Sequence, residues 1–439
     1  MGVLSLTRLF EGERPPDLPV AIGLDVPGCR TLGEFARAVA RVAGHTRNGG
    51  RRWVLACEDA WDFAAGLFGL LAVGRTVVLP PNFLPQTLQE LEREADGAIW
   101  EVPPEPASAA PWTGPIANGH LEFWTSGSTG EPKLVAKALA QLDAEVAMLE
   151  RTFGRRMASG TVAGTVPHHH IYGCLFRLLW PLAAGRPFLN EPLADPGGLR
   201  RALGQSRPAA LVASPAHLSR LPRLVDLGTI PDLPPVLFSS GGPLALADAL
   251  AWRRWVPGGV LEIYGSTETG GIAWRNQDAE PDSSLWTPLD DVQLDTEDGA
   301  LVVTSFRAGP GPQRLEDAVA PEPDGRFRLL GRLDRTLKLE EKRVSLPELE
   351  VALETHPWVA RAAVVPLEGR RPALGAVVLL SPGAPTERRP LIHALRAHLA
   401  KRFEGPALPR RWRFPRELPY DARGKLTVQA LAQLFLVHP

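Results

Sequence analysis

The sequence predicts an α/β protein: a large N-terminal domain of mixed, mostly parallel sheets flanked by helices, with a β-subdomain, and a small α+β C-terminal domain. Three observations support this fold class. Short apolar runs alternate with helical patterns through most of the chain, which favours parallel strands joined by helices. Residues 280–330 have hairpin character instead. After Asp334 a second series of strands and helices begins, so we place the domain boundary there, between residues 1–333 and 334–439.

The opening third of the chain alternates helical and strand patterns. Thr31 and Glu34 have the spacing of a capping box, which predicts a helix over residues 34–44. Residues 51–58 then have the pattern of a buried strand. The other predicted elements are helices over 60–74 and 86–95 and a strand at 77–79. This order is typical of a sheet with helices on its faces.

The middle of the chain continues with short apolar runs that end in small residues. The predicted strands cover residues 211–213, 236–239 and 261–264. Since α/β folds bind ligands beyond the carboxyl ends of such strands, we expect a functional site there. The pattern changes near Asp298 and Gly299, which mark a hairpin turn in the β-subdomain.

The predicted C-terminal domain is a compact α+β unit. Ser345 and Glu348 repeat the capping-box spacing ahead of a helix over residues 346–356. The other predicted elements are strands at 362–367, 374–380 and 411–414 and helices over 390–403 and 428–436.

Composition limits the classes of function. The 48 Lys and Arg nearly balance 49 Asp and Glu, and a net charge of −1 argues against a protein that coats nucleic acid or acidic membranes. Cys29, Cys57 and Cys174 are too widely spaced for a disulfide framework or a metal motif. Residues 1–16 lack the pattern of a signal peptide, and no apolar stretch reaches the ~18 residues of a membrane span. We therefore expect a soluble cytoplasmic protein.

The string WTSGSTGEPK (124–133) carries the most chemical information. Its glycines let the backbone approach a ligand closely, and its hydroxyls and N–H groups suit phosphate oxygens. Lys133 adds a positive charge. The spacing is not that of a Walker loop, because Glu131 and Pro132 follow Gly130. On composition alone, a flexible surface loop is an equal alternative.

This string resembles the phosphate loop of the AMP-forming adenylating enzymes, which include acyl- and aryl-CoA synthetases, luciferases and the adenylation domains of peptide synthetases. Further strings are similar to other motifs of the superfamily and follow in the same order. They are VPHHHIYG (166–173), FSSGGPL (238–244), IYGSTETG (263–270), GRLDRTLK (331–338) and the segment 418–425. On this order of motifs the chain is identified as a member of the superfamily.

The resemblance implies a role for each motif in binding ATP. The residues that would hold its phosphates are Thr125, Ser126, Gly127, Ser128, Thr129, Gly130 and Lys133. Those on the adenine side are Ser240, Gly241, Gly242, Tyr264 and Gly265. Without the resemblance, a lone Tyr in a strand is more often a core residue. Asp317 would bind the ribose with Arg332 as its companion, although Leu315-Glu316 replace the usual Thr-Gly.

The resemblance also implies the catalytic groups. Glu268 is the expected Mg²⁺ ligand, since Mg²⁺ prefers oxygen donors, and Thr267 would contact the α-phosphate. Lys425, on the mobile C-terminal domain, would bridge the substrate carboxylate and the α-phosphate in the transition state. That domain would rotate about Asp334 between two half-reactions.

Three consecutive histidines precede Ile171-Tyr172. Their spacing does not suit zinc. By resemblance His170 would gate the acyl channel, and His168 and His169 are expected to be structural. The enzymes that activate amino acids carry an Asp at this motif, and residues 166–173 hold none. The substrate is therefore expected to be an uncharged acyl or aryl acid, with an aromatic acid favoured.

The chain departs from the superfamily pattern at three places. The phosphate loop begins early, at Thr125; Glu341 replaces a glycine that faces the pantetheine path; and Leu315-Glu316 alter the approach to the ribose. These departures suggest a phosphopantetheine acceptor on an acyl carrier protein rather than free CoA. In this respect the chain resembles short stand-alone acyl or aryl acid ligases of aryl polyene-type pathways.

The expected activity is ATP-dependent, AMP-forming activation of a carboxylic acid to an acyl-adenylate. The acyl group would then pass to the thiol of a carrier protein or of CoA. The alternatives are a non-catalytic adenylate-binding scaffold and an adenylating enzyme with a different second step, such as a luciferase-like oxygenase. A serine hydrolase is excluded, because the chain has no G-x-S-x-G string.

Overall fold

The computed structural model describes most of the chain. The described residues are 2–24, 28–104, 110–126, 132–157, 159–191, 193, 196–206, 208–230, 233–339, 342–367, 373–403, 405–420 and 426–436. They form two compact units. Unit 1 consists of Met1–Ser284, Pro288–Gln293 and Thr304–Gly311, and unit 2 of Leu285–Thr287, Leu294–Val303 and Pro312–Pro439. The predicted boundary at Asp334 falls within unit 2 and stays a prediction.

One sheet of unit 1 has five strands in the order β5-β3-β4-β6-β7. The strands are Arg52–Leu55 (β3), Thr76–Leu79 (β4), Gly97–Ile99 (β5), His120–Ser126 (β6) and Pro132–Ala138 (β7). Neighbours run parallel except β6 and β7, which pair antiparallel from His120 opposite Ala138 to Ser126 opposite Pro132. The predicted phosphate loop therefore connects the two strands of a hairpin.

The other large sheet has nine strands in the order β14-β13-β12-β11-β10-β8-β9-β1-β2. Its centre is parallel, with β8, β10, β11 and β12 side by side, whereas β13 runs antiparallel to β12. The strands are Pro19–Ile22 (β1), Cys29–Thr31 (β2), Thr161–Gly164 (β8), Phe188–Leu189 (β9), Pro208–Ala213 (β10), Leu237–Ser239 (β11), Val260–Ser266 (β12), Gly270–Asn276 (β13) and Thr287–Pro288 (β14).

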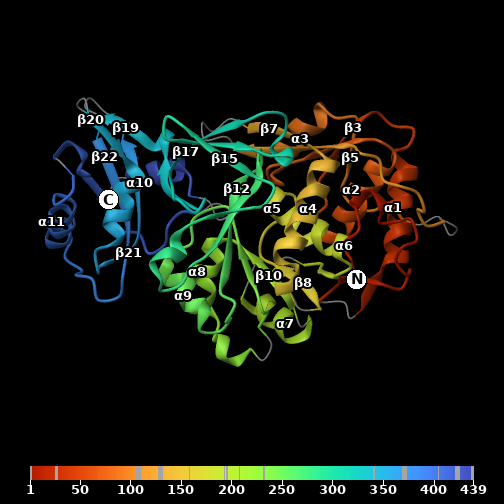
Figure 1. The fold of residues 1–439 in the computed structure, drawn as a ribbon, viewed down its shortest axis with the longest axis horizontal. Helices are drawn as coiled ribbons and strands as arrows, with labels where there is room; N and C mark the ends of the chain where they lie inside the picture. Colours follow the sequence, from red (N-terminus) through yellow and green to blue (C-terminus); the bar gives the residue numbers. More distant parts are fainter. Residues whose placement is uncertain are drawn as a thin grey trace. The chain divides into compact units, whose positions relative to one another are not determined.

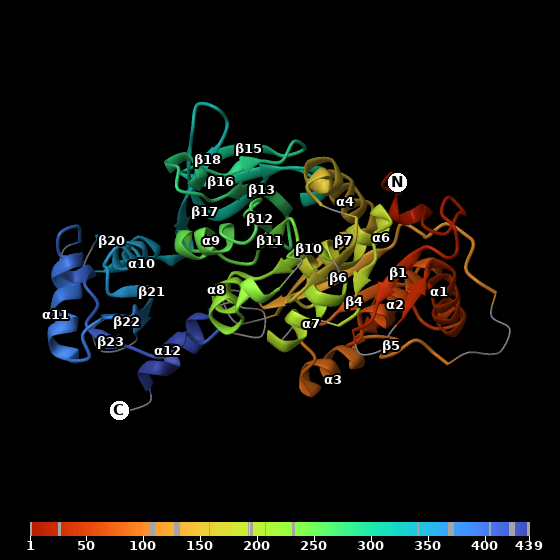
Figure 2. The ribbon, with the colours of Figure 1, turned by 90° about the horizontal axis from the view of Figure 1, so that it is seen from below.

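Helices cover both faces of this sheet. Leu211 and Leu237 pack with α7, α8 and α9, while Val212 and Phe238, one residue further along their strands, pack with α4 and α6. Successive side chains of a strand point to opposite faces, so these buried strands are apolar on both sides. Figure 2 shows α8 and α9 close together. The helices are Leu139–Phe153 (α4), Ile171–Gly173 (α5), Trp180–Ala184 (α6), Pro196–Ser206 (α7), Pro215–Leu224 (α8) and Leu246–Arg253 (α9).

Three helices accompany the five-stranded sheet: Leu32–Thr46 (α1), Ala60–Ala72 (α2) and Pro85–Arg93 (α3). Helix α1 begins with the predicted capping box, in which Thr31 Oγ1 accepts from the Glu34 N–H and Glu34 Oε2 accepts from the Thr31 N–H. Helix α2 lies beside α1 (Figure 1) and is buried along most of its length, which explains its apolar composition on every side.

Unit 2 contains a four-stranded antiparallel sheet formed by Gln293–Glu297 (β15), Ala300–Thr304 (β16), Gln313–Pro321 (β17) and Phe327–Arg332 (β18). Strands β15 and β16 meet at the predicted hairpin turn, where Asp298 and Gly299 have φ values of 51° and 77°. Both values are positive, which suits Asp-Gly in a tight hairpin.

The rest of unit 2 is an α+β arrangement with its own apolar core. Its elements are Thr336–Leu339 (β19), Lys342–Ser345 (β20), Leu346–Glu354 (α10), Val359–Leu367 (β21), Ala373–Leu380 (β22), Arg388–Leu399 (α11), Arg411–Arg413 (β23) and Val428–Leu436 (α12). Strands β21 to β23 form one sheet and β19 pairs with β20. The mixed α/β fold class predicted from the sequence is confirmed. Among the described residues, no helix has the length and apolar character needed to cross a membrane.

Candidate active site

Three of the predicted motifs lie at one edge of the nine-stranded sheet. Strands β8, β10, β11 and β12 are parallel neighbours, so their carboxyl ends lie along the same edge. The histidine loop (residues 166–173) follows β8, Ser240 follows β11, and the β12–β13 turn (residues 266–270) follows β12. This is the edge at which α/β sheets bind ligands.

Lys133 and Glu268 meet at this edge, although they lie far apart in the sequence. Lys133 is on β7 and Glu268 is in the β12–β13 turn, and Lys133 Nζ lies 2.8 Å from Glu268 Oε1. The two side chains are 61% and 37% exposed. Partial burial is the largest single influence and would raise the pKa of the Glu268 carboxyl, but the hydrogen bond and charge of Lys133, together with hydrogen bonds from within the turn, outweigh it and lower that pKa below its usual value. The site therefore holds an ionised carboxylate and an accessible cation.

The predicted phosphate-binding residues are only partly described. Thr125 Oγ1 donates to the Lys133 carbonyl oxygen at 3.2 Å, and Ser126 ends β6. Gly127, Ser128, Thr129 and Gly130 lie outside the described residues.

Hydrogen bonds inside the β12–β13 turn hold its shape. The Ser266 N–H donates to Thr269 Oγ1 at 3.1 Å, and the Thr269 N–H donates to Ser266 Oγ at 3.2 Å. Thr269 is buried, whereas Thr267 and Glu268 between these bonds are half-buried. The two hydrogen bonds between Ser266 and Thr269 thus fix the conformation of the turn that carries Thr267 and Glu268.

The predicted adenine-side residues follow the ends of β11 and β12. Ser240 Oγ donates to the Ile263 carbonyl oxygen at 2.8 Å, which ties the loop after β11 to β12. Tyr264 is half-buried, and Gly241, Gly242 and Gly265 are exposed. The structure brings these residues to the same edge as Glu268.

The histidine loop is anchored by its first histidine. His168 is 3% exposed, and its Nε2 donates to the Cys57 carbonyl oxygen at 2.9 Å. Burial, with a contribution from Arg177, lowers the pKa of His168 to about 3, so the ring stays neutral. The ring also packs on Phe63 at a centroid distance of 4.6 Å. His170 is half-buried, 4.3 Å from the His169 ring.

Three further contacts fix this loop. Arg177, which is fully buried in the π-helix Cys174–Leu179, donates from Nη1 to the Val166 carbonyl oxygen at 2.7 Å. The Tyr172 hydroxyl donates to the Ala213 carbonyl oxygen at 3.3 Å. Position 173 accepts only glycine, because a Cβ there would overlap the Pro167 carbonyl oxygen.

The predicted ribose pair lies in unit 2. Asp317 on β17 is opposite Arg332 on β18, with Arg332 Nη1 3.8 Å from Asp317 Oδ2. The antiparallel register thus brings together two residues that are fifteen apart in the sequence. Asp334 lies in the short 3₁₀ helix Leu333–Arg335, while Lys425 and Glu341 lie outside the described residues.

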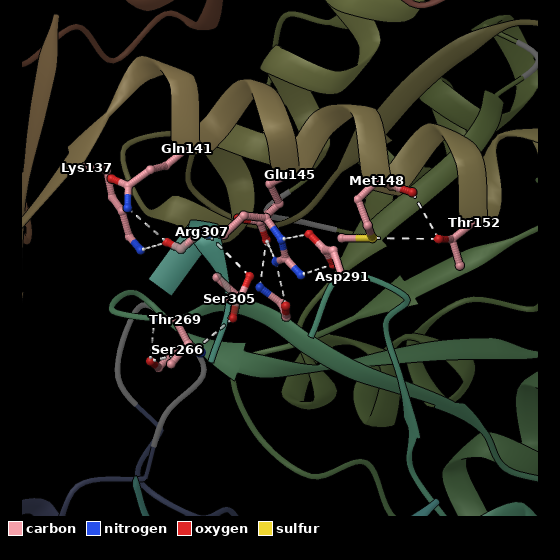
Figure 3. A network of polar contacts seen from close by, with 12 residues as sticks. Lys137, Gln141, Glu145, Met148, Thr152, Ser266, Thr269, Asp291, Ser305 and Arg307 are labelled. Carbon is pink, nitrogen blue, oxygen red and sulfur yellow. Dashed lines mark hydrogen bonds and ion pairs between the residues drawn. The ribbon is translucent and has the colours of Figure 1, made fainter. Parts of the chain in front are cut away.

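Sequence reasoning missed a network of charged side chains beside the β12–β13 turn (Figure 3), which we call the charged mount: Lys137, Glu145 and Arg307, which are buried, and Asp291, whose side chain is 31% exposed. Lys137 Nζ donates to the carbonyl oxygens of Glu268 and Arg307, the latter at 2.6 Å. Burial lowers the pKa of Lys137 to about 8. The spacing of Lys137 four residues after Lys133 is a signal, but it gains meaning only once residues 132–138 are known to form a strand.

Arg307 joins the charged mount to the turn. Its guanidinium makes two hydrogen bonds to Asp291, at 2.7 and 2.8 Å, and donates to the Gly271 carbonyl oxygen at 2.6 Å. Glu145 Oε1 accepts from the Gly271 N–H at 2.7 Å. Burial raises the pKa of Glu145, although Arg307 opposes that shift.

The donor set at this edge suits Mg²⁺. Among the residues that the structure describes, no three His, Cys, Asp or Glu side chains gather closely enough to hold a metal ion by themselves. Mg²⁺ commonly takes only one or two protein carboxylates beside substrate phosphates, and the ionised, half-exposed Glu268 fits that requirement.

Comparison with known proteins agrees with these observations. Residues 121–302 match the AMP-binding enzyme family, and residues 348–425 match the AMP-binding enzyme C-terminal domain. The 4-coumarate–CoA ligase of Rhodobacter capsulatus is 34% identical over 309 residues, covering 69% of this chain and 73% of that enzyme. Phosphinothricin tripeptide synthetase PhsC of Streptomyces viridochromogenes is 30% identical over 362 residues, covering 72% of this chain and 32% of that protein.

A solved structure shares the fold over nearly the whole chain. ATP-bound MatB from Rhodopseudomonas palustris has a TM-score of 0.79 at 18% identity, with 98% of each chain covered. The sequence match to the ligase relative and the order of the motifs lead to one conclusion. The chain belongs to the AMP-binding enzyme family and is an AMP-forming acid–thiol ligase.

Proposed function

We propose that this ligase activates an aryl acid with Mg·ATP and transfers the acyl group to a phosphopantetheine thiol. The observation that carries the proposal is the meeting of Lys133 and Glu268 at the carboxyl edge of the sheet. Adenylation builds negative charge on phosphate oxygens, so fixed cations and a metal ligand must already be in place.

In the first half-reaction the substrate carboxylate attacks the α-phosphorus of ATP, and the bond to pyrophosphate breaks. Lys133 would leave Glu268 for the β- and γ-phosphates, and Glu268 would hold Mg²⁺. When bound, Mg²⁺ neutralises charge on the phosphates. Thr267 would contact the α-phosphate, and Lys425 would orient the attacking carboxylate against it. The adenine-side residues and the pair Asp317 and Arg332 would position the nucleoside.

Several observations support an aryl acid as the substrate. The histidine loop, residues 166–173, contains no acidic residue that could pair with an amino group. The ring of Tyr172, two residues after His170, packs on the core residue Phe176 at a centroid distance of 4.9 Å, so aromatic side chains follow His170 directly in the chain. The relative from Rhodobacter capsulatus is named for an aryl acid, 4-coumarate.

The proposed acceptor is a carrier-protein phosphopantetheine, with CoA as the alternative. Glu341 stands where the family has a glycine, which adds charge and removes backbone freedom beside the pantetheine path. A tripeptide synthetase among the relatives also supports this proposal. In this second half-reaction the thiol attacks the adenylate carbonyl and AMP leaves, after residues from Asp334 onward rotate to withdraw Lys425.

The test is acid-dependent pyrophosphate release with Mg·ATP over a panel of aryl, short-chain, long-chain and amino acids. Each acid is tested alone, with CoA and with a holo acyl carrier protein. We expect release with aryl acids and acceleration by the holo carrier protein. Release confined to another class would overturn the aryl assignment, and acceleration by CoA alone would overturn the carrier protein. Silence across the panel, from protein that still binds ATP, would favour the non-catalytic scaffold.

A further inference from the structure

Strand β7 sends two lysines to one residue of the β12–β13 turn. Residues i and i+4 of a strand project from the same face, and Lys133 and Lys137 both reach Glu268. The Lys133 ammonium contacts the Glu268 carboxylate at 2.8 Å, whereas the Lys137 ammonium donates to the Glu268 main-chain carbonyl. One strand therefore contacts both the side chain and the main chain of the same residue.

The two lysines differ in their surroundings. The Lys133 side chain is 61% exposed and can exchange its partner for a ligand, while Lys137 is 3% exposed. A buried ammonium is stable only where protein acceptors replace water. The acceptors of Lys137 are the carbonyl oxygens of Glu268 and Arg307, which lie 131 and 170 residues after it in the sequence, so its charge joins β7 to both the turn and the Arg307 segment.

The other side of the turn is held by the rest of the charged mount, as Figure 3 shows. Glu145 accepts from the Gly271 N–H, and Arg307 donates to the Gly271 carbonyl oxygen. Arg307 is itself fixed by its two hydrogen bonds to Asp291. Charged side chains therefore form hydrogen bonds with the main chain at residues 268 and 271, on either side of Thr269 and its hydrogen bonds to Ser266.

We propose that Lys137 is a positioning residue for adenylation: by fixing the Glu268 main chain, it aims the Glu268 carboxylate at the metal of Mg·ATP. This inference rests on the metal role of Glu268 in the proposed function. Without the Lys137 ammonium, the partly buried Glu268 carbonyl oxygen loses its donor, while the Arg307 carbonyl oxygen keeps the 3.3 Å hydrogen bond from Gln141, so the turn relaxes on the side that carries Glu268. Loss of a group that orients a metal ligand typically costs about 10–100-fold in metal affinity or activity.

A purely structural role for Lys137 makes a different prediction. Lys137 also offsets the negative charge of buried Glu145. If that were its whole function, its loss would lower stability without any selective effect on the metal. The experiment must therefore measure what the metal contributes to nucleotide binding, separately from folding.

The measured quantity is the ratio of the affinity for Mn·ATP to that for metal-free ATP in EDTA, by calorimetry without acid substrate. Lys137→Met removes the ammonium donor and keeps an unbranched side chain as far as Cε. We expect this variant to lower the ratio by about tenfold or more, and to lower the kcat of pyrophosphate release with an unchanged KM for the acid. A ratio equal to that of the wild type would overturn the proposal.

Two variants complete the design. Arg186→Met breaks another partly buried ion pair of unit 1, Arg186 with Glu150 at 2.7 Å, and should leave the ratio unchanged. An equal fall in Arg186→Met and Lys137→Met would overturn the proposal, because general loosening would explain both. If Lys137→Met does not fold, Lys137→Gln, a shorter and neutral donor, is judged by the same criterion.

Glu268→Gln separates failure of this inference from failure of the proposed function. If Glu268→Gln keeps the wild-type ratio, Glu268 is not the metal ligand and the proposed role itself is wrong. If Glu268→Gln lowers the affinity ratio and Lys137→Met leaves it at the wild-type value, only the positioning role of Lys137 is wrong.

Discussion

The histidine loop and the β12–β13 turn follow parallel strands of one sheet and reach the same edge, yet they are held in different ways. The histidine loop is held mainly by packing and by single side chains that donate to main-chain carbonyls, as His168 does to Cys57 and Tyr172 to Ala213. The β12–β13 turn and the following Gly271 are held by three charged side chains, Lys137, Glu145 and Arg307, and Asp291 in turn holds the Arg307 guanidinium.

The difference follows from what each segment is proposed to meet. An uncharged ring is recognised by shape, which packing provides. Phosphates and a metal ion require charged groups in fixed places, and such groups can be buried only as a satisfied network. Removing one member of a buried ionic network leaves its partners uncompensated, so the turn should tolerate single substitutions less well than the loop.

Arg307→Met is expected to have the largest effect. Arg307 is 1% exposed, and its loss removes the cation that pairs with both Glu145 and Asp291. We expect the free energy of unfolding to fall by about 3–5 kcal/mol in urea titrations. Arg177→Met in the π-helix beside the histidine loop, which loses hydrogen bonds to carbonyls, should cost about 1.5–3 kcal/mol. Equal losses would remove the contrast between the two segments.

Glu268→Gln should lower the kcat of pyrophosphate release by about 10²–10³-fold, as for other single groups that stabilise transition-state charge. The substitution keeps the shape of the side chain and removes the negative charge. His170→Ala, in the histidine loop, should instead act mainly on the KM of the acid. The comparison is contradicted if the two variants change the same kinetic parameter by similar factors.

Gly173→Ala tests the packing of the histidine loop. The added Cβ overlaps the Pro167 carbonyl oxygen, so we expect a loss of about 1–3 kcal/mol of stability and a higher KM for the acid, with the KM for ATP unchanged. Gly44→Ala in α1 is the control, since a Cβ there meets open space and a helix gains from alanine. A KM for ATP that rises as much as that for the acid would contradict the assignment of this loop to the acid pocket.

The smallest expected effect is a pH dependence of stability from His168. Its pKa is about 3 in the folded chain against an ordinary value of 6.5, so between these values only the unfolded state binds the proton. Stability should therefore fall as the pH drops below 6.5. Between pH 7.5 and 5.5 this group alone should remove about 1.4 kcal/mol. In urea titrations at the two pH values, His168→Phe should show a pH-dependent loss of unfolding free energy that is smaller than that of the wild type by this amount. An equal loss in the two proteins would show that His168 is charged or exposed in the folded chain.

Much of the fold could be predicted because its signals are local. The capping box of α1 is formed by Thr31 and Glu34 alone, and the turn between β15 and β16 by Asp298 and Gly299. The predicted strand and helix patterns of the opening third are confirmed for β3, α2, β4 and α3, with ends that differ by a few residues. The antiparallel pairing of β6 with β7 and the order of strands in each sheet were not predicted, because they depend on contacts between distant segments.

The candidate site divides in the same way. Sequence motifs alone identify Lys133, Glu268 and the residues of the histidine loop as site candidates, and the structure brings them to one edge of the sheet. Lys137 and Arg307 stand in no such string, and Lys137 bonds to a residue 170 positions away. Its importance depends on burial, which one sequence does not reveal for a lysine. The roles proposed for Lys425 and for Gly127 to Gly130 stay predictions, since these residues lie outside the described part of the chain.

The charged mount also makes Mg·ATP binding depend on a late stage of folding. It joins Lys137 of β7 and Glu145 of α4 to Arg307, so its contacts form only when the chain between them has been synthesised and folded. Contacts of such long sequence separation form late, because the loop entropy must be overcome before they can stabilise anything. A nascent chain released before Arg307 would have every residue of the phosphate loop and the histidine loop, and the turn that carries Glu268, but not the arginine that holds that turn. We expect such a chain to bind Mg·ATP poorly.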